Sequence, residues 1–179
     1  MRRRSWRAAG ECHFNYMVLL ALGLEPRHCQ SNTRCLQLAG TGKPTAGAVL
    51  LVDRETGKPQ ERALNAFLEK HRCQEACRQP GIEAHCCRHP SGQAFILVAY
   101  HGGPEELAER LGHSVEDPRI RALLKSHKIL GLLNPKAGVA DTRIGAIIRD
   151  VVEATRRCID RARKACEAYT TPPPTNGAS

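Results

Sequence analysis

The chain has 179 residues, of which 41% are hydrophobic and 25% are charged. This length suits one compact domain, and this composition excludes a fully disordered, collagen-like or membrane-embedded chain. Lys and Arg outnumber Asp and Glu by 27 to 18, which gives a formal net charge of +9 at pH 7. A cationic surplus of this size favours polyanions, so we expect nucleic acid or an acidic protein surface as the partner.

Residues 1–46 are predicted to form an N-terminal basic arm, a short helix and a linker. The arm opens with several arginines, for which an organelle transit peptide is the alternative interpretation. Apolar residues from Cys12 to Leu22 recur at the three- and four-residue spacing of a helix face, and Gly23 and Pro26 supply a stop. Residues 25–46 are rich in Gly, Pro, Ser, Thr and Asn, which is typical of a long connection.

Residues 47–169 are predicted to form an α+β core domain. The continuous apolar run 47–53 indicates a strand that is covered on both faces. A helical face from Ala63 to His71 follows, and Pro80 and Gly81 must end that helix. The runs 82–88 and 93–100 flank a Pro-Ser-Gly turn, so they are expected to form a hairpin.

The last part of the chain is predicted to be mainly helical. Two short helices begin at Pro104 and Pro118, because proline is favoured in a first helical turn. A fourth strand is expected within 129–133, and a long amphipathic helix is expected from residue 141 or 142 to Tyr169. The expected fold is therefore a ferredoxin-like split β-α-β sheet with helices packed on it. Residues 170–179 contain three consecutive prolines and are expected to be a disordered tail.

The odd cysteine count and the lack of secretion signals in the sequence favour a reducing compartment. The nine cysteines are an odd number, so at least one thiol is unpaired. The sequence contains no N-x-S/T acceptor, and its first apolar run is too short to cross a bilayer and lacks a signal-peptide cleavage site. We therefore expect an intracellular protein of the cytoplasm or nucleus, without a transmembrane segment.

Seven Cys and His side chains are concentrated between His71 and His89. Zinc binds four such ligands in a tetrahedron, and a candidate zinc site consists of Cys73, Cys77, Cys87 and His89. The spacing differs from the paired C-x2-C units of ordinary zinc modules. Two alternatives are therefore open: the cysteines are core hydrophobes beside exposed histidines, or Cys86 and Cys87 contain a reactive thiol.

Asp53 and His101 each stand where a predicted strand ends. If the two strands are adjacent and parallel, His101 can act as a general acid or base that Asp53 orients, with Arg54 holding a negative substrate group and Cys87 nearby. This interpretation predicts a hydrolase or transferase of a phosphorylated or carboxylated small molecule. A turn aspartate and a capping histidine explain the same residues without chemistry.

The leading hypothesis is a non-enzymatic protein that contacts nucleic acid through its phosphates. The cationic side chains that would carry this function lie in the arm and on the last helix: Arg2, Arg3, Arg4, Arg7, Arg149, Arg156, Arg163 and Lys164. The last helix also carries acids at the spacing of solvent-side ion pairs, which is the alternative interpretation of its charges. A protein-interaction module stabilised by zinc is the third hypothesis.

Overall fold

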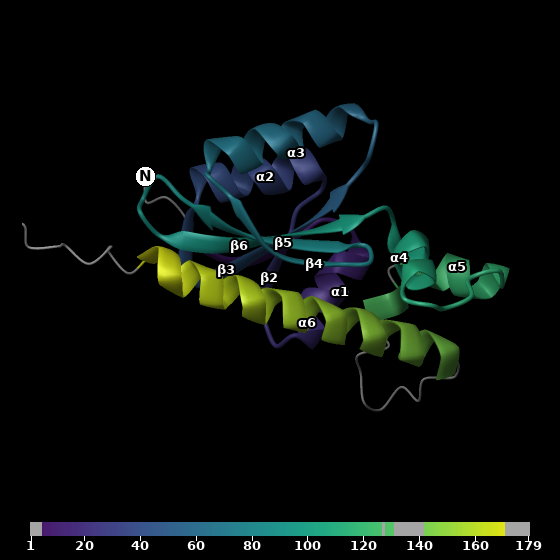
Figure 1. Cartoon of the computed structure of the whole chain (residues 1–179). Helices are drawn as coiled ribbons and strands as arrows, with labels where there is room; N and C mark the ends of the chain where they lie inside the picture. Colours follow the sequence, from purple (N-terminus) through teal and green to yellow (C-terminus); the bar gives the residue numbers. More distant parts are fainter. Residues whose placement is uncertain (1–4, 127, 131–141, 171–179) are drawn as a thin grey trace, which may run out of the picture.

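The computed structural model describes residues 5–126, 128–130 and 142–170, apart from the side chains of residues 142, 169 and 170. This part of the chain contains a six-stranded sheet and six α-helices (Figure 1). In chain order, the elements are β1 (Ser5–Gly10), α1 (His13–Ala21), β2 (Pro26–His28), α2 (Asn32–Thr41), β3 (Lys43–Arg54), α3 (Pro59–Lys70), β4 (Gln74–Gln79), β5 (Ile82–Arg88), β6 (Ala94–His101), α4 (Pro104–Arg110), α5 (Pro118–Lys125) and α6 (Thr142–Thr170).

The sheet is mixed, with strand order β2-β1-β3-β6-β5-β4. Strands β2, β1, β3 and β6 are mutually parallel. Strand β5 runs antiparallel to β6, as the predicted hairpin requires, and β4 runs antiparallel to β5. The mixed α/β character of the prediction is therefore confirmed. The ferredoxin-like arrangement is not confirmed, because the strand between β1 and β6 has parallel neighbours on both sides.

Helices cover both faces of the sheet (Figure 1). Helices α2 and α3 pack on one face, where Leu50 and Val52 of β3 are buried. Helices α1 and α6 pack on the other face, where Val49 and Leu51 are buried. Successive side chains of a strand point to opposite faces, so the unbroken apolar run of β3 supplies both cores. The prediction of a central strand at 47–53 is thus confirmed.

Helix α6 has the amphipathic pattern that the sequence predicts. Its buried residues include Ile144, Ile147, Val151 and Cys158, at three-, four- and seven-residue intervals. This stripe lies along the face of the sheet that β4, β5 and β6 form. Its opposite side carries exposed charged residues. The long C-terminal helix is therefore a structural part of the fold.

Three segments differ from the sequence prediction. Residues 5–10 form β1, which pairs with β3 in the same sheet, and are not part of a free arm. The expected linker 25–46 contains β2 and α2. Residues 74–79 form β4, whereas the preceding helix was expected to continue to Pro80. In β4 only Cys77 is buried, so the hydrophobic pattern of this edge strand is too weak to indicate a strand.

Some predictions concern residues outside the described part of the chain. Arg2, Arg3 and Arg4 belong to this group, as does the expected disordered tail from residue 171 onward. Of the expected fourth strand, Ile129 and Leu130 belong to a single 3₁₀ turn, and residues 131–133 lie outside the described residues.

Eight cysteines form four disulfides, and Cys12 is the remaining thiol. The pairs are Cys29–Cys35, Cys73–Cys87, Cys77–Cys158 and Cys86–Cys166. Disulfides persist in oxidising surroundings and are rare in the cytoplasm and nucleus. The prediction of a reducing compartment is therefore wrong. Among the helices of the described residues, none combines the length and the apolar character needed to cross a bilayer.

Candidate functional site

The parallel strands place several polar residues at one edge of the sheet. Strands β3 and β6 are adjacent, and their last residues, Arg54 and His101, are in register. The loops that follow these strands bound a pocket of about 500 Å³, whose lining includes Asp53, Lys58 and Arg110. Ligands of open α/β sheets commonly bind at the carboxyl ends of the parallel strands. We call this cavity the strand-end pocket.

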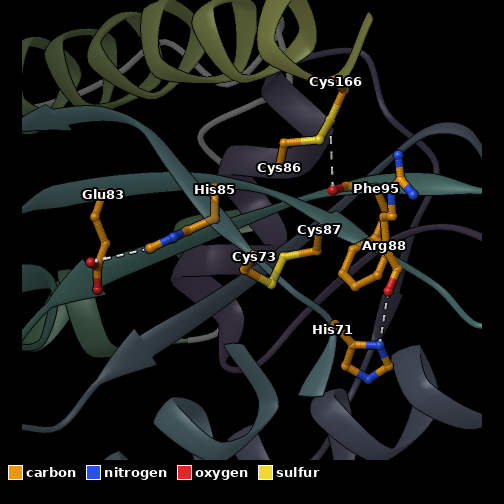
Figure 2. The surroundings of a disulfide bond; sticks show 9 residues. All are labelled: His71, Cys73, Glu83, His85, Cys86, Cys87, Arg88, Phe95 and Cys166. Carbon is orange, nitrogen blue, oxygen red and sulfur yellow. Dashed lines mark hydrogen bonds and ion pairs between the residues drawn. A yellow bond between two sulfur atoms is a disulfide. The ribbon is translucent and has the colours of Figure 1, made fainter. Parts of the chain in front are cut away.

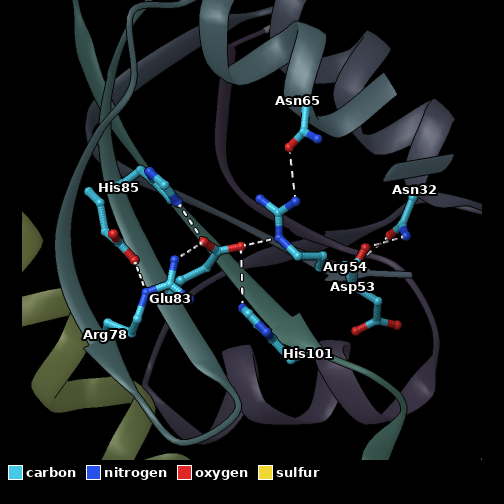
Figure 3. A network of polar contacts seen from close by, with 9 residues as sticks. Asn32, Asp53, Arg54, Asn65, Arg78, Glu83, His85 and His101 are labelled. Atoms are coloured by element: carbon cyan, nitrogen blue, oxygen red, sulfur yellow. Dashed lines mark hydrogen bonds and ion pairs between the residues drawn. The ribbon is translucent and has the colours of Figure 1, made fainter. Parts of the chain in front are cut away.

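Glu83 of β5 is the centre of a charged network beside this pocket (Figure 3). Its side chain is 2% exposed and forms an ion pair with the Arg54 guanidinium. His85 Nε2 and Arg78 Nη2 each lie 3.2 Å from Glu83 Oε2, and His101 Nε2 lies 3.5 Å from Glu83 Oε1. A buried carboxylate is costly unless it is paired, and these partners provide the pairing.

The partners set the charge state of Glu83. Burial alone would raise the pKa of this carboxyl, but the hydrogen bonds from His85 and Arg54 and the charge of Arg54 lower it from 4.5 to about 2. Glu83 is therefore a carboxylate at neutral pH. This residue was not predicted as functional from the sequence, although one signal was present: Glu83 is an acid within the run 82–88, which was expected to form a strand of the core sheet.

His101 lies in the wall of the pocket, with 21% of its side chain exposed. Burial lowers its pKa from 6.5, and the charge of Glu83 partly opposes this effect. The imidazole is therefore neutral at pH 7. Its contact with Glu83 is longer than an ordinary hydrogen bond, as acid–base contacts often are before a substrate binds. A carboxylate can only accept, so this contact favours the tautomer with the proton on Nε2.

The predicted pairing of Asp53 with His101 does not form. The required condition is met, because their strands are adjacent and parallel. However, Asp53 is in register with Tyr100, one residue before His101, so the two side chains point to opposite faces of the sheet. Arg54 also differs from its predicted role: Glu83 and Asn65 hold its guanidinium, the latter through a 2.9 Å hydrogen bond.

Asp53 lies in a separate polar environment on the face that α1 covers. Its Oδ1 accepts a 3.1 Å hydrogen bond from Asn15 Nδ2, and Asn32 clamps its backbone N–H and C=O. Burial raises the pKa of Asp53 from 3.8 to about 7; the Asn15 hydrogen bond opposes this shift, and Glu11 and Glu55 reinforce it. Asp53 is therefore partly protonated at neutral pH.

The candidate zinc ligands do not converge on one point. Cys73 is joined to Cys87 in the core under α2 and α3, and Cys77 is joined to Cys158 in the opposite core. His89 Nδ1 contacts Ser91 Oγ at 2.8 Å. These three cysteines therefore cannot form the predicted zinc site, because disulfide sulfurs are not thiolate ligands. In the described ranges, no group of three or more His, Cys, Asp or Glu side chains is arranged to hold a metal ion.

Neither Cys86 nor Cys87 is the reactive thiol that the sequence suggested, because both cysteines form disulfides. Figure 2 shows Cys86 bonded to Cys166 of α6, and Cys87 bonded to Cys73. Cys87 therefore cannot join His101 as a nucleophile. The free thiol is Cys12, whose pKa rises to about 12 through burial and the nearby charge of Asp53. A thiol in this state is a weak nucleophile.

The predicted nucleic-acid contacts are only partly grouped. Arg7 pairs with Glu25 at 2.7 Å, and it lines one cavity together with Arg163 of α6. On α6, Arg149, Arg156, Arg163 and Lys164 are all exposed. Three exposed acids follow the same helix at seven-residue intervals, namely Glu153, Asp160 and Glu167, and Asp160 pairs with Arg163 at 3.7 Å. The basic row is thus accompanied by an acidic row.

The comparisons with known proteins give no family. No protein-family model matches the chain, and no curated protein or solved structure matches it either. Function is therefore inferred from the geometry and electrostatics of the strand-end pocket and of α6.

Proposed function

We propose that the protein is a small-molecule enzyme of the hydrolase or transferase type that acts in the strand-end pocket, with His101 as its general base. The observation that carries this proposal is the placement of His101 between the buried carboxylate of Glu83 and the open pocket. A histidine that is oriented by a carboxylate and neutral at pH 7 meets the basic requirements of a general base.

Glu83 and His101 would share the work of proton transfer. The Nε2–H group faces the Glu83 carboxylate, so the lone pair on Nδ1 is left to remove a proton from a substrate hydroxyl or a water molecule. The imidazolium that forms would be stabilised by the fixed negative charge of Glu83. Arg54 and Asn65 act indirectly, because they hold the carboxylate in place.

Asp53 is the candidate general acid. It lines the same pocket from the other face of the sheet. With a pKa of about 7, it carries a proton in a substantial fraction of molecules at neutral pH and can donate it to a leaving group. Sites that combine an acid and a base commonly hold two groups whose environments move their pKa values in opposite directions, as seen here for Asp53 and His101.

The expected substrate carries a phosphate or carboxylate group. Lys58 and Arg110 line the pocket, together with the acids Glu55 and Glu106, and within the described residues neither cation forms an ion pair. Their charges would bind an anionic group and hold the substrate next to His101. Gly102 also lines the pocket: its φ of +88° suits glycine, and a side chain there would collide with Glu106.

Titration of the isotope-labelled protein with inorganic phosphate and with acetate tests this assignment. We expect either anion to shift the NMR signals of the His101 ring and the Lys58 and Arg110 amides, and we expect Arg110→Gln to weaken the binding. Arg157→Gln removes a cation from the exposed side of α6 and serves as the matched control. Saturable binding that is equally strong in Arg110→Gln would contradict the anion subsite.

Nucleic-acid binding through α6 is the second candidate function. It is favoured by four exposed cations that form no ion pair within the described part of the helix: Arg149, Arg156, Arg157 and Lys164. Titration with single-stranded and duplex oligonucleotides at several salt concentrations tests it. Binding through phosphates requires an affinity that falls steeply with salt, and Arg156→Gln should reduce the slope. An affinity that is independent of salt would refute this function.

A further inference from the structure

A groove lies between helices α2 and α3, the two helices that cover one face of the sheet. The cavity has a volume of about 360 Å³ and shares no lining residue with the strand-end pocket. Gly40, Ala63 and Ala66 are small residues in its lining, and Leu36 and Phe67 provide larger apolar surfaces. A cavity of this size lined mainly by apolar side chains is typical of a small-molecule site.

His71, at the end of α3, places a polar atom in this groove. Its side chain is packed among aromatic rings, with the Phe67 centroid at 4.2 Å and the Phe95 centroid at 5.8 Å, and the residue is only 2% exposed. Nδ1 lies 3.1 Å from the carbonyl oxygen of Arg88 (Figure 2). A carbonyl oxygen only accepts, so Nδ1 must carry the proton.

The other ring nitrogen of His71 is therefore a hydrogen-bond acceptor. Burial lowers the pKa of His71, so the ring is neutral at pH 7 and Nε2 has a free lone pair. Nε2 points away from Arg88 (Figure 2) and toward α2, because a Cβ atom added to Gly40 would lie 3.8 Å from it. Within the described residues no hydrogen bond to Nε2 is formed, and Nε2 is not one of the fully buried unpaired polar atoms, so its lone pair is accessible from the groove.

We propose that this groove binds a small aromatic molecule that carries a hydroxyl group. The ring would lie between α2 and α3 against Leu36 and Phe67, and its hydroxyl would donate a hydrogen bond to His71 Nε2. The exposed Lys70 at the rim would favour an additional acidic substituent on the ligand. This site is independent of the strand-end pocket, so either assignment can be wrong without affecting the other.

A comparison of phenol with toluene in NMR titrations of the full chain tests the proposal. The two molecules have similar size, but only phenol can donate a hydrogen bond to Nε2. We expect phenol to shift the signals of Gly40 and of the His71 ring, and to bind on the order of fivefold more tightly than toluene. Equal affinities, or shifts that avoid the groove, would overturn the proposal.

Gly40→Ala tests the position of the hydroxyl without a large change in structure. The new methyl group would be in ordinary van der Waals contact with His71 Nε2 and would cover it, while alanine favours the helix. Phenol binding should weaken by about fivefold, the difference expected between phenol and toluene. Gly103→Ala is the matched control, because its Cβ meets no atom within 4 Å. Unchanged phenol affinity in a folded Gly40→Ala protein would also overturn the proposal.

Discussion

His101 Nε2 and Glu83 Oε1 lie 3.5 Å apart, although the two residues belong to different, antiparallel strands. The contact joins the end of β6 to the start of β5, at the edge of the sheet where the strand-end pocket opens. It combines a carboxylate that is ionised at neutral pH with a histidine that is not. The proposed catalytic function depends on this combination.

Replacing Glu83 with Gln should destabilise the fold. The substitution leaves the guanidinium of Arg54 without its carboxylate at a site where the glutamate side chain is 2% exposed, and breaking such a pair costs about 3 kcal/mol. Urea denaturation at pH 7 measures the loss. Glu25→Gln is the control, because the Arg7–Glu25 pair is exposed and should contribute less than about 1 kcal/mol. Equal effects of the two substitutions would contradict the central role of Glu83.

The effect of Glu83→Gln should depend on pH. The pKa of Glu83 is lowered on folding, so its stabilising contribution is complete above the unfolded value of 4.5 and is lost as the pH falls toward the folded value of about 2. The gap in unfolding free energy between the wild-type protein and the variant should therefore narrow between pH 5 and pH 2. A gap that stays constant over this range would argue against a lowered pKa.

Much of the fold follows from local sequence patterns. Helix α1, the helices α3 to α6, the central part of β3 and the β5–β6 hairpin have clear periodicity and start or stop residues, so they were predicted. Strand β1 was not, because its burial depends on pairing with β3, a non-local contact that periodicity does not reveal. The disulfide pairing was inaccessible for a similar reason, since a cysteine count does not specify connectivity.

Asp53 should make the protein more stable at mildly acidic pH than at alkaline pH. Its folded pKa of about 7 lies above the unfolded value of 3.8, so the folded state binds more protons between these values and stability falls as the pH rises through them. A tenfold difference in proton affinity between the folded and unfolded states corresponds to about 1.4 kcal/mol. Asp53→Asn keeps an oxygen for Asn15 and should remove this slope, as thermal unfolding from pH 4 to pH 8 can show. If the decrease in stability with rising pH is the same in the variant, then groups other than Asp53 cause it.

The Cys77–Cys158 disulfide should contribute substantially to stability. It connects β4 to α6 across a sequence separation of 81, and a cross-link over so long a segment restricts the unfolded chain strongly. The double substitution Cys77→Ala, Cys158→Ala should lower the free energy of unfolding by about 2–5 kcal/mol in urea denaturation. The pair Cys29–Cys35, with a separation of 6, should contribute less. A larger loss of stability on removing Cys29–Cys35 than on removing Cys77–Cys158 would contradict the explanation from chain entropy.

Cys12 should resist alkylation in the folded protein. Its pKa of about 12 leaves almost no thiolate at pH 8, and only the thiolate reacts rapidly with iodoacetamide. Mass spectrometry should show slow modification of Cys12 in buffer and rapid modification in urea, without addition of reductant. Rapid labelling of the folded protein, or labelling of any of the eight other cysteines in urea, would contradict the thiol and disulfide assignment.

The candidate site was only partly predictable. The sequence places His101 and Asp53 at strand ends, but not the register that puts them on opposite faces of the sheet. Glu83 reaches His101 only because β6 runs back antiparallel to β5, which brings the end of β6 beside the start of β5. The predicted zinc ligands show the same limitation, because Cys77 and Cys87 are close in sequence and lie in opposite cores.

The protonation of His101, followed by ¹⁵N NMR from pH 4 to pH 9, tests the central claim most directly. We predict a pKa below 6.5, a neutral ring at pH 7 with its proton on Nε2, and a further decrease of the pKa in Glu83→Gln, because Glu83 raises it. A pKa above 6.5, a proton on Nδ1, or a pKa that does not respond to Glu83→Gln would contradict the proposed general base.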